Sequence, residues 1–487
     1  MKYFEVIISS ILIIMCFESC YKEEIIFNTE PNNLLELPLI LRMNHKDCSF
    51  DNNQNSLRYS VSEEVIPKFE VFIEFQEYSV IFFEDQLLKN NQINNLGEIK
   101  INTEYKVQVV TNNIITELSL IFTKLPIVQI TTPNQIYDEP KSLAKIVVNY
   151  SDKQAVISYI GIEQRGGWHT LQLPKRSYNF SFLNSIYTDD KISKSLFDLK
   201  SNTDWTLDGM YTDNIKVKNK IASKIWADMP GDKHFGIQLN YVELFINNEH
   251  QGLYCLGEKI NAELLSLSNN EALLYKAIGW TGPKCFEESS QNIPTIDRWD
   301  GWVQKYPNPN QRINWEPLAR LRDLIVNSND EEFISQISNT INIDNFIDYY
   351  LFLNLICATD NLGKNIFLTR ALVSDPLRII PWDFDGAFSA SAIISNNRLY
   401  KRLVALNPIN FDQKLKDRWV YLRNSIFSST HLLQIVESNL KQLQSSDIID
   451  IENKKWSSDI KIQNEFEKLN FWITERLPIL DNYYEKL

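Results

Sequence analysis

The sequence predicts an α+β protein with a small N-terminal β-sandwich, a second β-rich part and a helical C-terminal part. Short runs of alternating apolar residues fill the N-terminal region, strands and helices mix in the middle, and helical periodicity dominates from Trp315 onward. We therefore expect a leader over 1–19, a β-sandwich-like module over 20–123 and a larger domain over 124–487, β-rich over 124–260 and α-rich over 261–487.

Composition and charge exclude several classes of protein. The 487 residues include 44% hydrophobic and 12% aromatic side chains, enough for a sizeable core and unlike a disordered chain. With 49 Lys and Arg against 62 Asp and Glu, the formal net charge of −13 argues against a nucleic-acid partner. The sequence contains no CxxC, HExxH, GxSxG, GxxxxGK[ST] or GxGxxG motif, so it does not support the common zinc, serine-hydrolase or nucleotide-loop sites.

The first twenty residues have the pattern of an export signal. Lys2 gives a thin positive region, and the apolar stretch over 6–17 is too short to span a membrane. Ser19-Cys20 then resembles the end of a bacterial lipoprotein signal, with lipid on Cys20; an ordinary secretory signal is the alternative. We expect a chain anchored through lipid in the cell envelope, at the outer membrane or cell surface, after removal of the signal peptide.

The N-terminal module is predicted from alternation. Runs over 69–75, 105–109 and 117–121 alternate apolar and polar residues, and clusters of Asn separate them. This pattern is typical of strands with one buried face joined by turns. In a surface lipoprotein we expect such a module to be a spacer.

The larger domain begins with strands and continues with helices. A hairpin is expected over 241–256, where two apolar runs flank the turn residues 247–252. The other predicted elements are strands over 127–130, 144–150, 156–163 and 178–182, and helices over 215–226, 317–327, 331–338 and 344–359.

One acidic cluster follows the predicted helix over 345–359, for which Asp344 is the expected N-cap. Asp360 then falls at the C-terminus of the helix, where the helix dipole disfavours a carboxylate, so it needs a cation or a metal ion as partner. Asn365 follows five residues later and opens a predicted strand over 366–369. Considered alone, an Asp-Asn loop is more often a turn or a cap.

A second acidic cluster, Asp383-Phe384-Asp385, follows a predicted strand over 377–380. Because a hairpin returns the chain to the loop it left, we expect Asp383 to lie near Asp360 and Asn365. A kinase active site has this order: one Asp accepts the proton of the substrate hydroxyl, and Asn with a second Asp holds Mg²⁺. Considered alone, Asp-Phe-Asp is more often a solvated loop.

A cation for phosphate is expected earlier in the chain. Lys175 and Arg176 lie at a predicted strand, and the turn Gly166-Gly167 upstream would let the backbone approach a nucleotide. A surface turn followed by a solvated basic pair is the alternative.

Taken in order, these segments resemble the CotH kinase family, named for a spore coat protein H. The likeness runs from about 125 to about 470. It includes Arg165-Gly166, Pro174 to Tyr178, Asp204-Trp205, Asp213 to Asn219, 242–246, Gln251 to Tyr254, Glu258 to Ile260, Asp360 to Asn365 and Pro381 to Asp385.

The resemblance implies an atypical, secreted protein-kinase-like fold of two lobes that uses ATP and Mg²⁺ and phosphorylates Ser or Thr hydroxyls of a protein. It also implies a role for each candidate residue. Asp360 would be the catalytic aspartate, and Asn365, Asp383 and Asp385 would bind metal. Lys175, Arg176 and Glu258 would bind nucleotide, with Glu258 where a hinge would touch adenine. The sequence departs from the family at Lys218-Asn219, where Arg-Asn is usual, and Lys lacks the bidentate fork of Arg.

Two other functions fit the sequence. A non-catalytic surface protein could reuse the fold for adhesion or for binding protein or carbohydrate, since ATP is scarce outside the cytosol. The segment 297–302 offers Trp299 and Trp302 to a sugar, although a place in the core is the expected use of such side chains. A scaffold for envelope assembly would bind neither nucleotide nor glycan.

Overall fold

The computed structural model describes residues 25–26, 40–167, 170–231, 234–279, 286–287, 292–395 and 397–487. The chain divides into two compact units, each built from three segments. The first unit is Met1–Gly209, Tyr241–Leu256 and Ser445–Ser458, and the second is Met210–Asn240, Gly257–Gln444 and Asp459–Leu487. The predicted leader and Cys20 lie outside the described residues.

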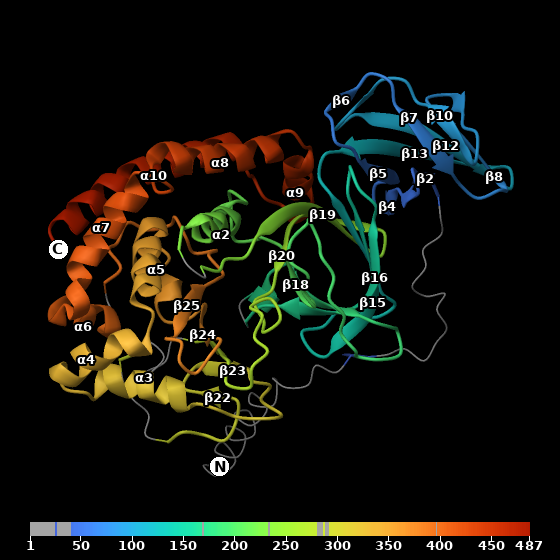
Figure 1. Ribbon diagram of the computed structural model, residues 1–487. Helices are drawn as coiled ribbons and strands as arrows, with labels where there is room; N and C mark the ends of the chain where they lie inside the picture. The colour runs from blue at the N-terminus through green and yellow to red at the C-terminus, as the bar shows by residue number, and fades with distance from the viewer. Residues whose placement is uncertain are drawn as a thin grey trace, which may run out of the picture. The chain divides into compact units, whose positions relative to one another are not determined.

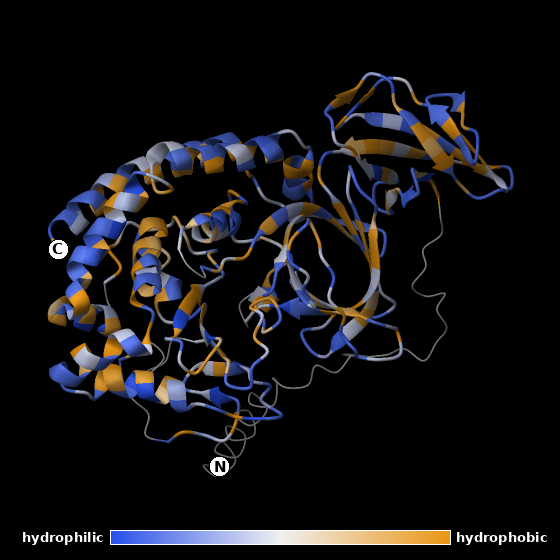
Figure 2. Cartoon of the chain, viewed as in Figure 1, coloured by the Kyte–Doolittle hydropathy of each residue, from blue (hydrophilic) through white to orange (hydrophobic). Residues whose placement is uncertain are grey.

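The N-terminal part of the first unit is made of β-strands, as predicted (Figure 1). One sheet has the order β10-β7-β2-β3 and another the order β4-β5-β13-β12-β8-β9. Leu57, Ile73, Val107 and Phe122 from both sheets pack in one core, and apolar and polar residues alternate along the strands (Figure 2). The strands are β2 (Arg42–Met43), β3 (Lys46–Asp47), β4 (Ser49–Asp51), β5 (Ser56–Ser60), β7 (Glu70–Glu74), β8 (Ser79–Phe83), β9 (Gln86–Leu87), β10 (Gln92–Asn95), β12 (Glu104–Thr111) and β13 (Ile114–Thr123), with a separate pair, β6 (Val65–Ile66) and β11 (Ile99–Lys100).

The rest of the first unit is a closed sheet. Its strands have the order β15-β14-β19-β20-β18-β17-β16, and β16 pairs again with β15, which closes the ring. Val128, Ile146, Phe180, Trp205 and Leu244 are buried in its core. The strands are β14 (Ile127–Thr131), β15 (Lys141–Asn149), β16 (Val156–Arg165), β17 (Ser177–Leu183), β18 (Asp204–Asp208), β19 (Leu239–Ile246) and β20 (Glu249–Glu258), with β1 (Ile25–Ile26) parallel to β15.

One helix from near the C-terminus belongs to this unit. α9 (Ile448–Trp456) follows Asp447 and packs with the β-strands, although α8 and α10, which flank it in sequence, belong to the second unit. Lys455 contacts Glu249 at 2.7 Å, and the Trp456 indole donates to the Gln251 carbonyl. A contact between residues so far apart in sequence cannot be read from local patterns.

The second unit combines one antiparallel sheet with most of the helices. Its strands, in the order β22-β23-β21-β24-β25, are β21 (Leu273–Ala277), β22 (Arg298–Trp299), β23 (Trp302–Tyr306), β24 (Ile366–Arg370) and β25 (Arg378–Pro381). Its helices are α2 (Lys218–Asp228), α3 (Glu316–Val326), α4 (Asp330–Thr340), α5 (Ile343–Ile356), α6 (Arg398–Leu406), α7 (Phe411–Arg423), α8 (Ser429–Gln444) and α10 (Ile462–Glu485). The predicted change from a β-rich N-terminal region to a helical C-terminal region is confirmed.

α5 is buried along nearly its whole length and serves as a neighbour to the edge strand β25. The Asn345 side chain accepts from the Ile379 N–H at 2.7 Å and donates to the Ile379 carbonyl. These two bonds pair the backbone N–H and carbonyl of the edge strand, as a neighbouring strand would.

Trp299 and Trp302 are buried, which removes the support for a sugar-binding face.

Three predicted helix details were wrong. α5 begins after Asn342, whose side chain accepts from the Asn345 N–H, so Asn342 and not Asp344 is the N-cap. α5 ends at Ile356, because Cys357 is left-handed (φ 50°), and Thr359–Leu362 forms a separate 3₁₀ turn. The helix predicted from 215 begins at Lys218.

Within the described residues, no helix has the length and apolar character needed to cross a membrane.

Candidate functional site

The two acidic clusters meet at one end of the β24–β25 hairpin. The antiparallel register places Ile366 opposite Pro381, and the Trp382 N–H donates to the Asn365 carbonyl at 3.0 Å. Asn365 and Asp383 are therefore near neighbours across the hairpin, as the sequence predicted. Asp360 reaches the same end through the 3₁₀ turn Thr359–Leu362.

Asn361 joins the two clusters. Its buried side-chain amide donates to the Asn365 carbonyl at 3.0 Å and to the Trp382 carbonyl at 2.8 Å. The Tyr349 hydroxyl of α5 donates to the Asn361 carbonyl, which fixes the turn from the other side. Asn361 lies inside the Asp-Asn motif, but nothing in the motif alone distinguishes it from a turn residue.

Asp360 has a cationic partner, although α5 ends at Ile356 and Asp360 does not lie at the C-terminus of that helix as predicted. The Lys364 ammonium lies 2.8 Å from the Asp360 carboxylate, and both side chains remain partly exposed. The Lys364 N–H also donates to the Asp360 carbonyl, which closes the turn. The carboxylate is thus held in place and still reaches solvent.

Two residues of the site have a left-handed backbone. Asn365 has φ 55° and Asp383 has φ 65°, a region in which Asn and Asp are the best tolerated residues after Gly. Such conformations persist where the surrounding structure imposes them, and they are frequent at functional sites. Here the Asn361 amide donates to the carbonyls of Asn365 and of Trp382, the residue before Asp383.

The Asp-Phe-Asp segment is divided between core and surface. Phe384 is buried and its ring lies edge-on to Phe352 of α5 at 5.3 Å. Asp383 is half-buried and Asp385 is exposed. The Phe384 N–H donates to the Asn219 side chain at 3.2 Å, so α2 also holds this loop.

The start of α2 is fixed by Asp213. The Asp213 carboxylate accepts from the backbone N–H groups of Ile215 and Lys218, and burial raises its pKa. Lys218, where the family usually has Arg, donates to the Ser389 hydroxyl. Asp213 therefore fixes the start of α2, and Asn219 of α2 holds the second acidic cluster.

Lys175 lies in the first unit, just before β17, with its side chain completely buried. Its ammonium lies 2.6 Å from the Glu452 carboxylate of α9 and 4.6 Å from the centre of the Tyr254 ring. It also donates to the Leu253 carbonyl. A kinase pairs its phosphate-binding lysine with a helix glutamate in this way. Sequence reasoning missed Glu452, because no motif surrounds it.

Gly252 makes room for this ion pair. It has φ +87°, and a Cβ at this position would collide with the Glu452 carboxylate. The adjacent Leu253 N–H donates to the same carboxylate at 2.7 Å. A glycine is therefore required here both by the backbone and by the space that Glu452 occupies.

The other predicted nucleotide residues have structural contacts. Arg176 is half-buried, and its carbonyl accepts from the Tyr254 hydroxyl. Glu258, at the end of β20, is buried and accepts from the Gln238 N–H at 3.0 Å. Trp168 and His169, which follow the predicted glycine turn, lie outside the described residues.

The donor set at the hairpin end fits a hard cation. Within the described residues, no three His, Cys, Asp or Glu side chains gather as metal ligands, so an amide oxygen would have to join the carboxylates. Asn365 is half-buried, and its side chain makes no hydrogen bond in the described part of the chain. An amide oxygen beside carboxylate oxygens suits Mg²⁺.

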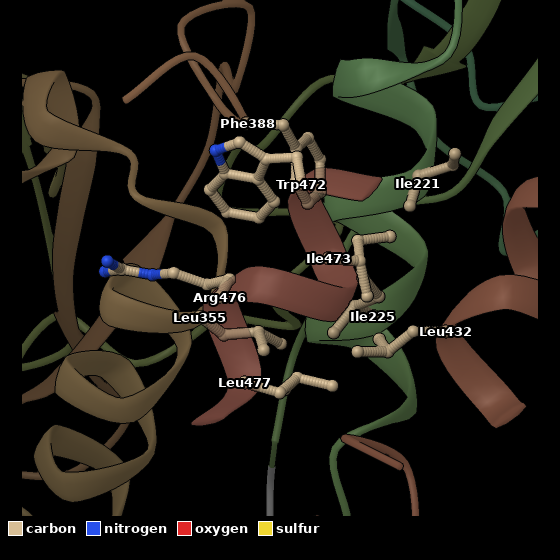
Figure 3. A pocket seen from close by; sticks show the side chains of 9 residues that line it. All are labelled: Ile221, Ile225, Leu355, Phe388, Leu432, Trp472, Ile473, Arg476 and Leu477. Carbon is tan, nitrogen blue, oxygen red and sulfur yellow. The ribbon is translucent and has the colours of Figure 1, made fainter. Parts of the chain in front are cut away.

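Two pockets of the second unit contain none of these residues. An apolar one between α2, α5, α8 and α10 has a volume of about 10 Å³, room for about one water molecule (Figure 3). A polar one of about 560 Å³ contains the ion pair of Arg418 with Asp348 and the side chain of His234. Neither is a candidate for the chemistry expected of Asp360.

Comparison with protein families confirms the resemblance. The family model described as CotH kinase protein matches residues 162–480, more than half of the chain. A search of curated proteins gave no match. The matched region includes Lys175, Glu452 and the hairpin end with Asp360.

Proposed function

Because the chain belongs to the CotH kinase family, we propose that it transfers the γ-phosphoryl group of ATP to Ser or Thr hydroxyls of a protein. The kinase-like division into a β-rich and an α-rich lobe is part of this proposal. The observation that carries it is the hairpin end, where Asn361 holds Asn365 and Asp383 together beside Asp360.

Asp360 would act on the acceptor. Its carboxylate takes the proton of the substrate hydroxyl as the hydroxyl oxygen bonds to the γ-phosphorus and the bond to the ADP oxygen breaks. The Lys364 ammonium, 2.8 Å from the Asp360 carboxylate, would orient it. Transfer of this kind needs positioning and charge neutralisation more than covalent help.

Asn365 and Asp383 would hold Mg²⁺, with Asp385 assisting from the surface. When bound, the ion neutralises charge on the phosphates. The left-handed backbone of Asn365 and Asp383 directs the two residues away from the regular ladder of the hairpin. Lys175 would bind phosphate, oriented by Glu452, and Arg176 and Glu258 would line the nucleotide site.

The test is phosphoryl transfer by purified protein spanning 21–487 with labelled ATP, Mg²⁺ and candidate protein substrates. Asp360→Asn should abolish transfer and leave nucleotide binding largely intact. Asp375→Asn is the matched control, since Asp375 lies in the turn at the opposite end of the same hairpin and accepts only a turn hydrogen bond from Leu372 among the described contacts. Full activity of the Asp360 variant would refute the assigned role.

The complete burial of Lys175 favours a second candidate, a non-catalytic protein that uses this fold to bind another protein. Thermal unfolding with and without Mg-ATP discriminates between the two, because a ligand stabilises only a protein that binds it. A rise in the melting temperature with Mg-ATP supports the kinase. No rise supports the binding protein.

We also propose that the chain acts in the cell envelope, anchored by lipid on Cys20. This proposal depends on the sequence of the first twenty residues alone. Incorporation of labelled palmitate into the wild type but not into Cys20→Ser would support it, and labelling of both proteins would refute it.

A further inference from the structure

An arginine of the N-terminal module is buried against the helix that carries Glu452. Arg58 lies on β5 and is 2% exposed. Its two terminal nitrogens donate to the two oxygens of Asp447 at 2.9 and 2.5 Å, which is a bidentate pair. Its Nε lies 2.6 Å from the Glu243 carboxylate of β19.

Asp447 is the residue from which α9 begins. Its side chain caps no N–H of the helix and instead faces Arg58. A second residue of the module, Asn102, accepts from the Asp447 N–H and donates to the Ser445 carbonyl. The module therefore holds the segment entering α9 by both side chain and backbone.

α9 depends on such contacts for its position. It has nine residues, too few for a helix to be stable alone. Glu452 lies in its middle, is 1% exposed, and accepts from Lys175 and from the Leu253 N–H. A shift of the helix start would move Glu452 relative to Lys175.

Buried ion pairs contribute little to stability on balance, because the cost of desolvation offsets the attraction. The place of Arg58 between the carboxylates of Asp447 and Glu243 is better explained by the position that it fixes for the start of α9. Removal of Arg58 would leave Glu243, whose pKa is held low chiefly by Arg58 and His250 against the effect of burial, without its main cation.

We propose that Arg58 is a positioning residue for phosphoryl transfer: it anchors the start of α9 and so keeps Glu452 on Lys175. This inference rests on the proposed kinase function. The N-terminal module would then be part of the catalytic apparatus and not a spacer.

The decisive variant is Asp447→Ala in the full chain. It removes the bidentate pair, and Arg58 keeps Glu243 as a partner, so we expect the variant to fold. Asp450→Ala is the matched control, because Asp450 is an exposed carboxylate in the first turn of the same helix. Arg58→Lys tests the pair from the module, since Lys keeps the charge but loses the fork.

Two measurements are needed. The first is the rate at which acetic anhydride modifies Lys175, followed by mass spectrometry, which requires no activity. We expect Asp447→Ala to raise this rate about tenfold, Arg58→Lys to raise it less, and Asp450→Ala to leave it unchanged. The second is turnover: kcat should fall about tenfold in Asp447→Ala, with an unchanged KM for the protein substrate.

An unchanged Lys175 modification rate in Asp447→Ala would overturn the inference whatever the activity. A raised rate with full turnover would also overturn it, because the reaction would not need the anchored helix. If the wild type transfers no phosphate, the proposed function fails, and the modification rates alone decide whether Arg58 holds Glu452 on Lys175.

Discussion

Replacement of Asn361 by Ala tests the architecture of the hairpin end directly. The amide of Asn361 makes two hydrogen bonds, to the carbonyls of Asn365 and Trp382. Each is worth about 1 kcal/mol, and a buried carbonyl that loses its donor costs about 1 kcal/mol more, so the free energy of unfolding should fall by about 2–3 kcal/mol. Urea denaturation followed by tryptophan fluorescence measures this loss.

The loss of activity should exceed what the loss of stability explains. Without Asn361 the two strand ends no longer hold Asn365 and Asp383 in register, and phosphoryl transfer by the folded variant should fall about tenfold or more. The assay is initial-rate transfer from labelled ATP, at a temperature where both proteins are folded.

Asn354→Ala is the matched control. The Asn354 side chain is also buried and makes hydrogen bonds of 2.8–3.1 Å with the backbones of Tyr350 and Ile394. Its loss should cost a similar free energy of unfolding and leave transfer nearly intact. Equal activity of the two variants, or full activity of Asn361→Ala, would refute the reasoning.

Three further predictions concern stability. Glu452→Ala leaves Lys175 buried without its carboxylate, so the free energy of unfolding measured by urea denaturation should fall by about 3–5 kcal/mol. The double variant Lys175→Met/Glu452→Leu removes both charges and should lose less stability. Equal losses in the two variants would contradict this account. Burial lowers the pKa of His234 to about 4, below its value in the unfolded chain. The unfolded state therefore binds the proton first, and the free energy of unfolding of the wild type should decline by at most about 3 kcal/mol as the pH falls from 6.5 to 4. Calorimetry of His234→Gln should show a weaker dependence of stability on pH over the same range. Gly252→Ala should lower the melting temperature more than Gly97→Ala does. Both glycines have a left-handed backbone, but only at Gly252 would an added Cβ collide with the Glu452 carboxylate. Equal decreases in melting temperature would show that this collision does not matter.

The sequence was sufficient where the signal is local. Alternation predicted the strand that became β7, and the apolar runs around Asn247-Asn248 predicted the β19–β20 hairpin. The convergence of Asn365 with Asp383 followed from a short hairpin, which brings its ends together whatever the rest of the fold does.

The sequence was insufficient where a contact joins distant segments. Glu452 pairs with a lysine 277 residues earlier and lies on a helix whose own pattern contains no motif. Likewise, nothing in the sequence around Arg58 distinguishes it from other strand residues, and only the folded chain brings Asp447 next to it. Helix ends were also predicted poorly, since both Asn342 and Asp344 can cap a helix and only the path of the backbone selects between them.

The order in which the ion pair is assembled has a consequence for synthesis. A polypeptide leaves the ribosome from its N-terminus, so Glu452, which lies 277 residues after Lys175, emerges much later than the lysine. Until then the lysine cannot be oriented, even in a chain that already contains Asp360, Asn365 and Asp383. A fragment that ends between Asp385 and α9 would retain these groups but lack Glu452, so in the proposed reaction the pairing ties the onset of phosphoryl transfer to how far translation has run.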